Sequence, residues 1–86
     1  MCTYLTTSVP VAASSAKGPD GWFKPSAATV YYDHPVHAPA EHTLNIDLLN
    51  PAMGPAARVA MELEPAVARA LAEAILETLA TTEALA

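Results

Sequence analysis

All three histidines of the chain fall within nine consecutive positions, as His34, His37 and His42. Pro35 and Pro39 stand between them, and because proline lacks a backbone donor and fixes its own φ angle, this stretch cannot continue as a helix. Neutral imidazole is the commonest metal ligand among side chains. Three imidazoles on a stiff loop therefore predict an open metal site, with zinc or another late first-row transition metal as the expected ion.

Two further side chains could complete such a site. Glu41 adjoins His42 and could bind the metal directly or orient an imidazole. Cys2 carries the single thiol of the sequence, which could act as a soft ligand or as a nucleophile. The histidine spacing matches no well-known zinc signature, so a second interpretation stays open. In that interpretation the histidines are structural residues that hydrogen-bond to neighbouring carboxylates or to backbone at strand ends.

Catalytic groups outside this loop are sparse. The sequence has no nucleophile–histidine–acid pattern with an oxyanion hole and no pair of carboxylates whose spacing identifies an acid and a base. It also has no glycine-rich phosphate loop. Whether the protein is an enzyme therefore stays open, and no catalytic residue is assigned.

Alternating apolar and polar residues predict that two strands flank the histidine loop. In residues 28–34, His34 shares a face with the apolar side chains, and in residues 42–48, His42 does the same. If these strands pair as a hairpin, the two imidazoles lie at the same rim of the sheet, each partly buried. The loop then positions its ligands between two rigid elements.

Two more strands and one helix complete the expected elements. Residues 2–11 favour a strand that lies at a sheet edge or ends in a bulge, because Pro10 cannot donate to a neighbouring strand. Residues 58–63 alternate as a further strand, and residues 66–80 are mostly strong helix formers that follow Pro65, a favourable first-turn residue. The expected helix has a wide apolar stripe, made of Ala68, Leu71, Ala72, Ile75 and Leu79.

The connections between strands decide the fold class. Residues 18–21 have strong turn chemistry, and Trp22 and Phe23 after them are expected to plug one end of a core, the alternative being an exposed aromatic platform for a ligand. Every link between strands is too short for a parallel crossover, so the sheet should be antiparallel. The predicted class is α+β, with a small antiparallel sheet of about four strands and one C-terminal helix packed on one face, in a single domain over residues 1–86.

Composition limits the partners. The chain of 86 residues is 52% hydrophobic and 15% charged, which is more apolar surface than a small monomer can hide, so we expect a homodimer. A net charge of −5 argues against nucleic acid. No run reaches the roughly 18 apolar residues of a membrane span. The start of the sequence lacks a basic region and a long apolar core, so a cytoplasmic location is expected.

Several segments resemble a family of short, uncharacterised actinobacterial proteins. The matching segments are the start MCTYLT, residues 17–23, the run DHPVHAPAEHTLNID from Asp33 to Asp47, and the C-terminal helix. The resemblance covers nearly the whole chain, and the run from Asp33 to Asp47 is its most specific part. It implies a single-domain protein and supplies no activity, cofactor or catalytic residue.

Two functions from different classes remain as hypotheses. In the first, a small metal-binding protein holds its ion with His34, His37 and His42, aided by Cys2 or Glu41, and leaves a position for water or substrate. In the second, a non-catalytic homodimeric module uses the histidine loop to shape an interface or a pocket for a small-molecule ligand. The clustered imidazoles favour the first, and the sparse acid and base groups favour the second.

Overall fold

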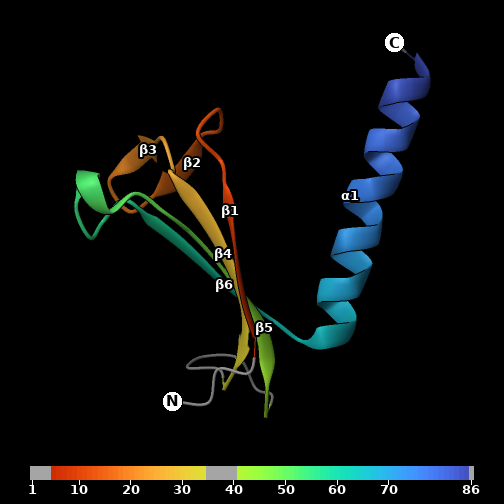
Figure 1. Cartoon of the computed structure of the whole chain (residues 1–86), viewed down its shortest axis with the longest axis horizontal. Helices are drawn as coiled ribbons and strands as arrows, with labels where there is room; N and C mark the ends of the chain where they lie inside the picture. Colours follow the sequence, from red (N-terminus) through yellow and green to blue (C-terminus); the bar gives the residue numbers. More distant parts are fainter. Residues whose placement is uncertain (1–4, 35–40, 86) are drawn as a thin grey trace.

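The computed structural model describes residues 5–34 and 41–85 of the chain. Its main sheet is antiparallel, with the strand order β1-β4-β5-β6 (Figure 1). These strands are β1 (Leu5–Pro10), β4 (Ala27–Asp33), β5 (Thr43–Leu49) and β6 (Arg58–Leu63). The smaller elements are β2 (Ala16–Gly18) and β3 (Gly21–Phe23), which pair with each other, and the 3-10 helix η1 (Pro51–Met53). The chain ends in the helix α1 (Pro65–Leu85). The predicted α+β class is confirmed.

The strand register confirms the hairpin expected around the histidine loop. β4 and β5 pair antiparallel, with Tyr32 opposite Leu44 and Asp33 opposite Thr43. The next positions outward are His34 and His42. β1 lies at an edge of the sheet, as Pro10 predicts.

The main sheet has one apolar and one polar face, because side chains alternate along each strand and the register aligns them across strands. The apolar face consists of Val9, Ala28, Val30, Tyr32, Leu44, Ile46, Leu48, Val59, Met61 and Leu63. The polar face carries, among others, Thr29, Tyr31, Thr43, Asn45, Asp47, Arg58 and Glu62. All of the listed apolar-face residues except the edge residue Val9 are half-buried, so this face is only partly covered.

Within the described residues, the buried apolar core is small and lies where the β2–β3 hairpin meets the main sheet. Ala16, Phe23 and Ala57 are its buried members, and Leu48 and Val59 pack against them. The β2–β3 hairpin lies close to the start of β6, and Gly18 at the end of β2 permits this approach because it has no Cβ. This cluster closes one end of the sheet and leaves most of the apolar face uncovered.

The two aromatic residues expected to plug one end of the core differ in their burial. Phe23 is buried, whereas Trp22 is 71% exposed. Because they are neighbours on β3, their side chains point to opposite sides of that strand. The prediction is therefore confirmed for Phe23 and wrong for Trp22.

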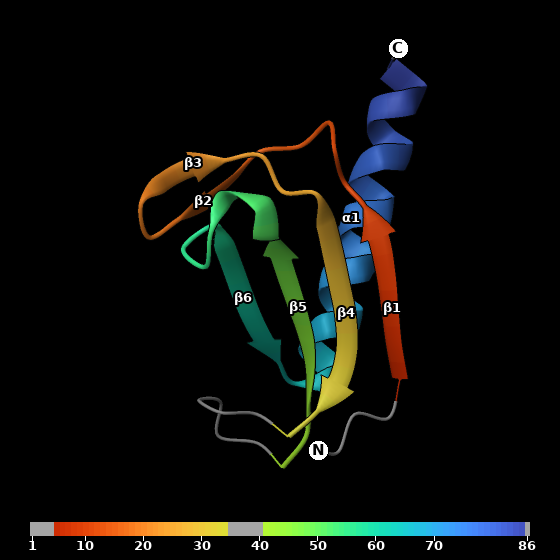
Figure 2. The ribbon, with the colours of Figure 1, turned by 60° about the vertical axis from the view of Figure 1, so that its left-hand side comes forward.

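Helix α1 leaves the sheet rather than lying along it. It starts one residue after β6, and the amide of Ala68 donates to the carbonyl of Glu64 at 2.9 Å, so helical bonding begins within the link itself. Figure 1 shows α1 diverging from the sheet toward its C-terminus, and Figure 2 shows it behind the strands, over one face of the sheet. Among the described residues of α1, Ala68 is half-buried and every other one is exposed. No described helix is long and apolar enough to cross a membrane.

The molecule exposes more surface than a compact chain of its size. Its accessible surface is 6249 Å² for a mass of 9.0 kDa, whereas a folded monomer of that mass exposes about 4,900 Å². The excess is about 1,400 Å². The radius of gyration is 14.3 Å, compared with about 12 Å for a compact domain of this length. The splayed helix contributes to both differences, because all of its residues except Ala68 are exposed.

The close approach at Gly18 gives a test of the small core. A Cβ at Gly18 would lie 2.9 Å from the carbonyl oxygen of Ala56 and 3.3 Å from Cε1 of Phe23. We expect Gly18→Ala to lower the free energy of unfolding by about 1–3 kcal/mol, because backbone and a buried ring must shift. Denaturant unfolding measures this, with the exposed neighbour variant Lys17→Ala as control, expected within about 0.5 kcal/mol of wild type. Equal stability of both variants would contradict the described packing.

Candidate functional site

The two described histidines lie side by side at one end of the sheet. The ring centroids of His34 and His42 are 4.4 Å apart with an interplanar angle of 31°. His42 also stacks on Tyr32, at 5.5 Å and 12°. Two imidazoles on one tetrahedral zinc have centroids roughly 5 Å apart, since each bound nitrogen lies about 2.1 Å from the ion. The observed pair is therefore close to the spacing that a shared metal requires.

Backbone contacts hold His34 in place. Its backbone amide donates to Oδ1 of Asp33 at 2.7 Å, and its Nδ1 lies 3.1 Å from the carbonyl oxygen of Glu41. Because a carbonyl oxygen only accepts, Nδ1 carries the proton in this contact. A metal bound by neutral His34 would then use Nε2, an arrangement common among metal-binding histidines.

The predicted ligands are only partly brought together. His34 and His42 are adjacent, but His34 is exposed and His42 half-buried, so the expectation of partial burial holds for His42 alone. The side chain of Glu41 is exposed, and its backbone carbonyl makes the contact with His34. His37 and Cys2 lie outside the described residues. Within residues 5–34 and 41–85, no three His, Cys, Asp or Glu side chains group closely enough to hold an ion.

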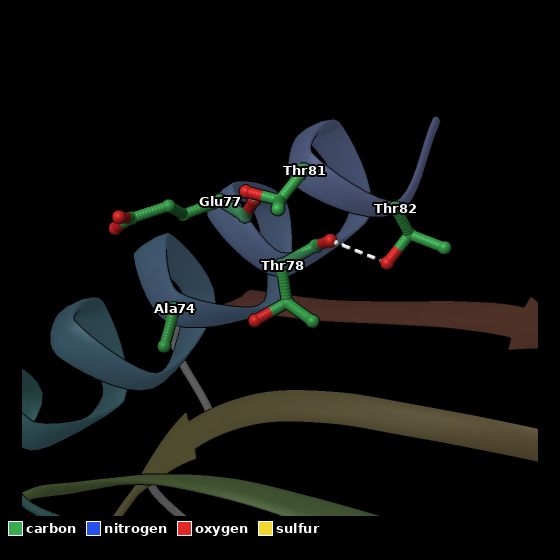
Figure 3. A pocket seen from close by; sticks show the side chains of 5 residues that line it. All are labelled: Ala74, Glu77, Thr78, Thr81 and Thr82. Carbon is green, nitrogen blue, oxygen red and sulfur yellow. Dashed lines mark hydrogen bonds between the residues drawn. The ribbon is translucent and has the colours of Figure 1, made fainter. Parts of the chain in front are cut away.

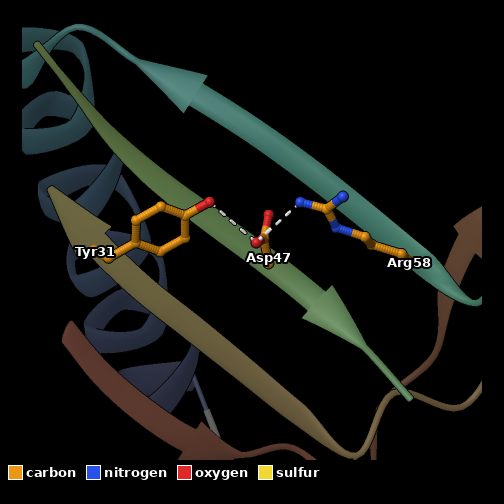
Figure 4. Close-up of polar contacts among 3 residues, drawn as sticks. All are labelled: Tyr31, Asp47 and Arg58. Carbon is orange, nitrogen blue, oxygen red and sulfur yellow. Dashed lines mark hydrogen bonds and ion pairs between the residues drawn. The ribbon is translucent and has the colours of Figure 1, made fainter. Parts of the chain in front are cut away.

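A second cluster of polar side chains lies on the polar face, centred on β5. Thr43, Asn45 and Asp47 are 0%, 4% and 8% exposed. The hydroxyl of Tyr31 donates to Oδ2 of Asp47 at 3.1 Å, and Nη2 of Arg58 donates to the same oxygen at 3.1 Å (Figure 4).

The other buried polar residues of β5 are also satisfied. The hydroxyl of Thr43 donates to Oδ1 of Asn45 at 2.6 Å. Every buried polar side-chain atom in the described part of the chain has a partner. This row therefore stabilises the sheet from its polar side and offers no unpaired group to a ligand.

The environment of Tyr31 changes its acidity. Burial raises the pKa of the Tyr31 hydroxyl above its ordinary value of 10.0, and the negative charge and hydrogen bond of Asp47 raise it further. Arg58 and Asn45 oppose this shift. Tyr31 is thus held in its neutral form as a hydrogen-bond donor.

The alternation of apolar and polar residues does not predict the burial of Thr43, Asn45 and Asp47, because it assigns them to a polar face exposed to solvent. Their burial could be inferred from the position of β5 between two strands with long polar side chains that can reach Asp47. These side chains are Tyr31 on β4 and Arg58 on β6. Both are displaced by two residues from the position opposite Asp47, so they reach it diagonally.

A cavity of about 460 Å³ occupies the angle between the apolar face and the first turns of α1. From the sheet, Tyr32 and Leu44 line it. From the helix and its start, the lining residues are Pro65, Ala68, Arg69, Ala72, Glu73 and Leu76. Its volume is in the range of small-molecule sites. Tyr32 connects it to the histidine pair, because the same ring stacks on His42.

A hollow of about 290 Å³ on the C-terminal half of α1 has no comparable chemistry (Figure 3). The hydroxyl of Thr82 donates to the carbonyl of Thr78 at 2.8 Å, and that of Thr81 donates to the carbonyl of Glu77 at 3.0 Å. These hydroxyls bond within the helix, as threonine commonly does. The hollow is a feature of the helix surface.

The acidity of Tyr31 predicts how stability responds to alkaline pH. A folded-state pKa above the unfolded value contributes stability that is present below about pH 10 and is lost as pH rises toward the folded pKa. We expect the melting temperature of wild type to fall above that pH, and Tyr31→Phe to flatten the fall while removing about 1 kcal/mol at neutral pH. Thermal melts across alkaline pH measure this, with Tyr32→Phe as control. An unchanged slope in Tyr31→Phe would contradict it.

Comparison with known proteins identifies the family. No curated protein and no solved structure matches the sequence. A family model described as "Family of unknown function (DUF6295)" matches residues 1–86. The expected resemblance to an uncharacterised family is thereby confirmed. The chain belongs to this family of unknown function, DUF6295.

Proposed function

We propose that this protein acts as a non-catalytic homodimeric interaction module. One observation carries the proposal: in a single chain, the apolar stripe of α1 is exposed and the apolar face of the sheet is only partly covered. The five large apolar side chains Val67, Leu71, Ile75, Leu76 and Leu79 are between 39% and 67% exposed.

The uncovered area has the size that a dimer requires. The excess surface of about 1,400 Å² per chain exceeds the roughly 800 Å² that each partner buries in a standard interface. A second copy is the occupant that the chain itself supplies, since every copy carries both a free apolar helix and a free apolar sheet face. A two-fold axis relates such surfaces reciprocally and closes the assembly.

The free energy gained by burying these side chains is comparable to the free-energy cost of association. Full burial of one Leu, Ile or Val side chain contributes about 1.5–3 kcal/mol. Covering the exposed half of the five α1 side chains in both copies therefore contributes on the order of 10 kcal/mol. Association of two proteins costs about 4–15 kcal/mol. The apolar face of each sheet adds to the favourable side, so a stable dimer results.

The histidine pair has a structural role in this proposal. The stack of Tyr32, His42 and His34, together with the contact from His34 to the Glu41 carbonyl, holds the two ends of the histidine loop together. His34 and His42 thus lie beside Tyr32, which lines the cavity, where they can shape the rim of an interface or of a small-molecule pocket.

Self-association has a direct test. Wild type should have a mass of about twice 9.0 kDa by light scattering at micromolar concentration. Ile75→Glu should weaken the dimer at least tenfold, because a charge replaces an apolar contact. Ala70→Glu is the matched control, since Ala70 lies on the polar side of the same helix, and it should stay dimeric. A monomeric wild type, or equal weakening by both variants, would contradict the proposal.

A metal site at the histidine loop is the second candidate function. It is supported by the adjacency of His34 and His42 and by the protonated Nδ1 of His34, which directs Nε2 to any ion. His37, with Cys2 or Glu41, would supply the remaining ligands, and zinc is the favoured ion. The bound ion would offer Lewis-acid chemistry to a substrate.

The metal hypothesis is tested on protein purified without an affinity tag and reconstituted with zinc. Wild type should hold one ion per chain by elemental analysis. His34→Ala, His37→Ala and His42→Ala should each bind at least about tenfold more weakly, because each removes one imidazole. Glu83→Gln, at the far end of α1, is the control and should bind like wild type. Absence of zinc from reconstituted wild type would exclude this function.

A further inference from the structure

We propose that the dimer forms by reciprocal exchange of its helices, with the stripe Val67, Leu71, Ile75 and Leu79 of each α1 packed on the apolar face of the partner subunit's sheet. This inference rests on the proposed homodimer and specifies which surfaces meet. It would replace the open angle seen in one chain by two helix-on-sheet contacts related by a two-fold axis.

The start of α1 sets which side of the helix faces its own sheet. The residues of the helix that line the cavity opposite Tyr32 and Leu44 are Ala68, Arg69, Ala72, Glu73 and Leu76. Besides Leu76, this side has two alanines and two charged residues, so it offers little apolar surface to the sheet. If α1 simply bent toward its own sheet, this side would make the contact.

Most of the stripe lies on a different side of the helix from the residues that line the cavity. Because an α-helix turns by about 100° per residue, Val67, Leu71, Ile75 and Leu79, spaced by four, lie along one side. Val67, Leu71 and Ile75 are rotated by roughly a quarter turn or more from the centre of the side that faces Tyr32 and Leu44, whereas Leu79 lies closer to that side, next to Ala68 and Ala72. In a single chain, most of the stripe therefore points away from the apolar face of its own sheet and stays exposed.

The link between β6 and α1 leaves little freedom to rotate the helix. Only Glu64 separates Leu63 from Pro65, and the bond from Ala68 to Glu64 already belongs to the helix. Proline fixes one of the two dihedral angles at its own position. The stripe thus keeps its direction relative to the sheet.

Exchange covers both kinds of exposed apolar surface in each copy. Helices that pair with each other alone leave both sheet faces open, and apolar sheet faces that stack alone leave both helices open. A helix on the partner subunit's sheet covers one of each, twice. The sizes agree, since the 21 residues of α1 span about 31 Å and the seven-residue strands β4 and β5 span about 24 Å.

Cross-linking between differently labelled chains tests the exchange. In a Cys2→Ser background, one chain carries Leu71→Cys on the stripe and the other carries Ile46→Cys on the apolar face. The two are co-refolded as an equal mixture and treated with a short bis-maleimide. Exchange predicts a covalent heterodimer whose yield approaches the half of chains that random pairing allows. Met61→Cys provides a second sheet position in case Ile46→Cys does not fold.

Three controls make the outcome decisive. Ala70→Cys replaces Leu71→Cys on the polar side of the same turn and should yield several-fold less heterodimer. The double variant Leu71→Cys/Ile46→Cys, reacted at high dilution in the dimer, should link between chains. Linkage within one chain would overturn the exchange. A sample of Leu71→Cys alone that forms as much covalent dimer as the mixture would overturn it too. So would a mixture whose heterodimer yield is no higher than the yield with Ala70→Cys. Light scattering on the same samples distinguishes these results from loss of the dimer, which would overturn the proposed function as well.

Discussion

The direction in which α1 leaves the sheet depends on a link of one residue, and the exposed surface of the molecule follows from that constraint. Helical hydrogen bonding starts at Glu64, directly after β6. Pro65 then fixes its own backbone angle. The apolar stripe of the helix stays exposed and the apolar face of the sheet is only partly covered, so the chain exposes more area than a compact monomer of its mass.

The sheet is held together without the helix by two other sets of contacts. At one end, Phe23 and Ala16 of the small hairpin pack against Ala57 and close a compact core. On the polar face, Asp47 accepts hydrogen bonds from Tyr31 and Arg58, which join the three strands β4, β5 and β6. Stabilisation from the polar side leaves the opposite, apolar face available for an intermolecular contact.

The sequence predicts the parts of this structure that depend on local patterns. Period-two alternation locates β4 and β5 and places His34 beside His42, because pairing across a short loop follows from the strands themselves. Pro65 and the helix-forming residues after it locate α1. The burial of Thr43 and Asn45 and the exposure of Trp22 depend on neighbours far apart in sequence, so alternation cannot predict them. The splay of α1 depends on backbone geometry at a single link, which composition does not encode. The predicted metal ligands are not tested as a set, since His37 and Cys2 lie outside the described residues.

Hydrogen exchange of the α1 amides reports whether the helix is covered by a second copy of the chain. A helix with no buried residue and no partner exchanges quickly, whereas a helix packed in an interface opens only with the assembly. At concentrations where the dimer is populated, we expect the amides of residues 68–80 to be protected to the same degree as those of β4 and β5. Dilution to the monomer should remove this protection. Fast exchange along α1 beside a protected sheet, at every concentration, would contradict it.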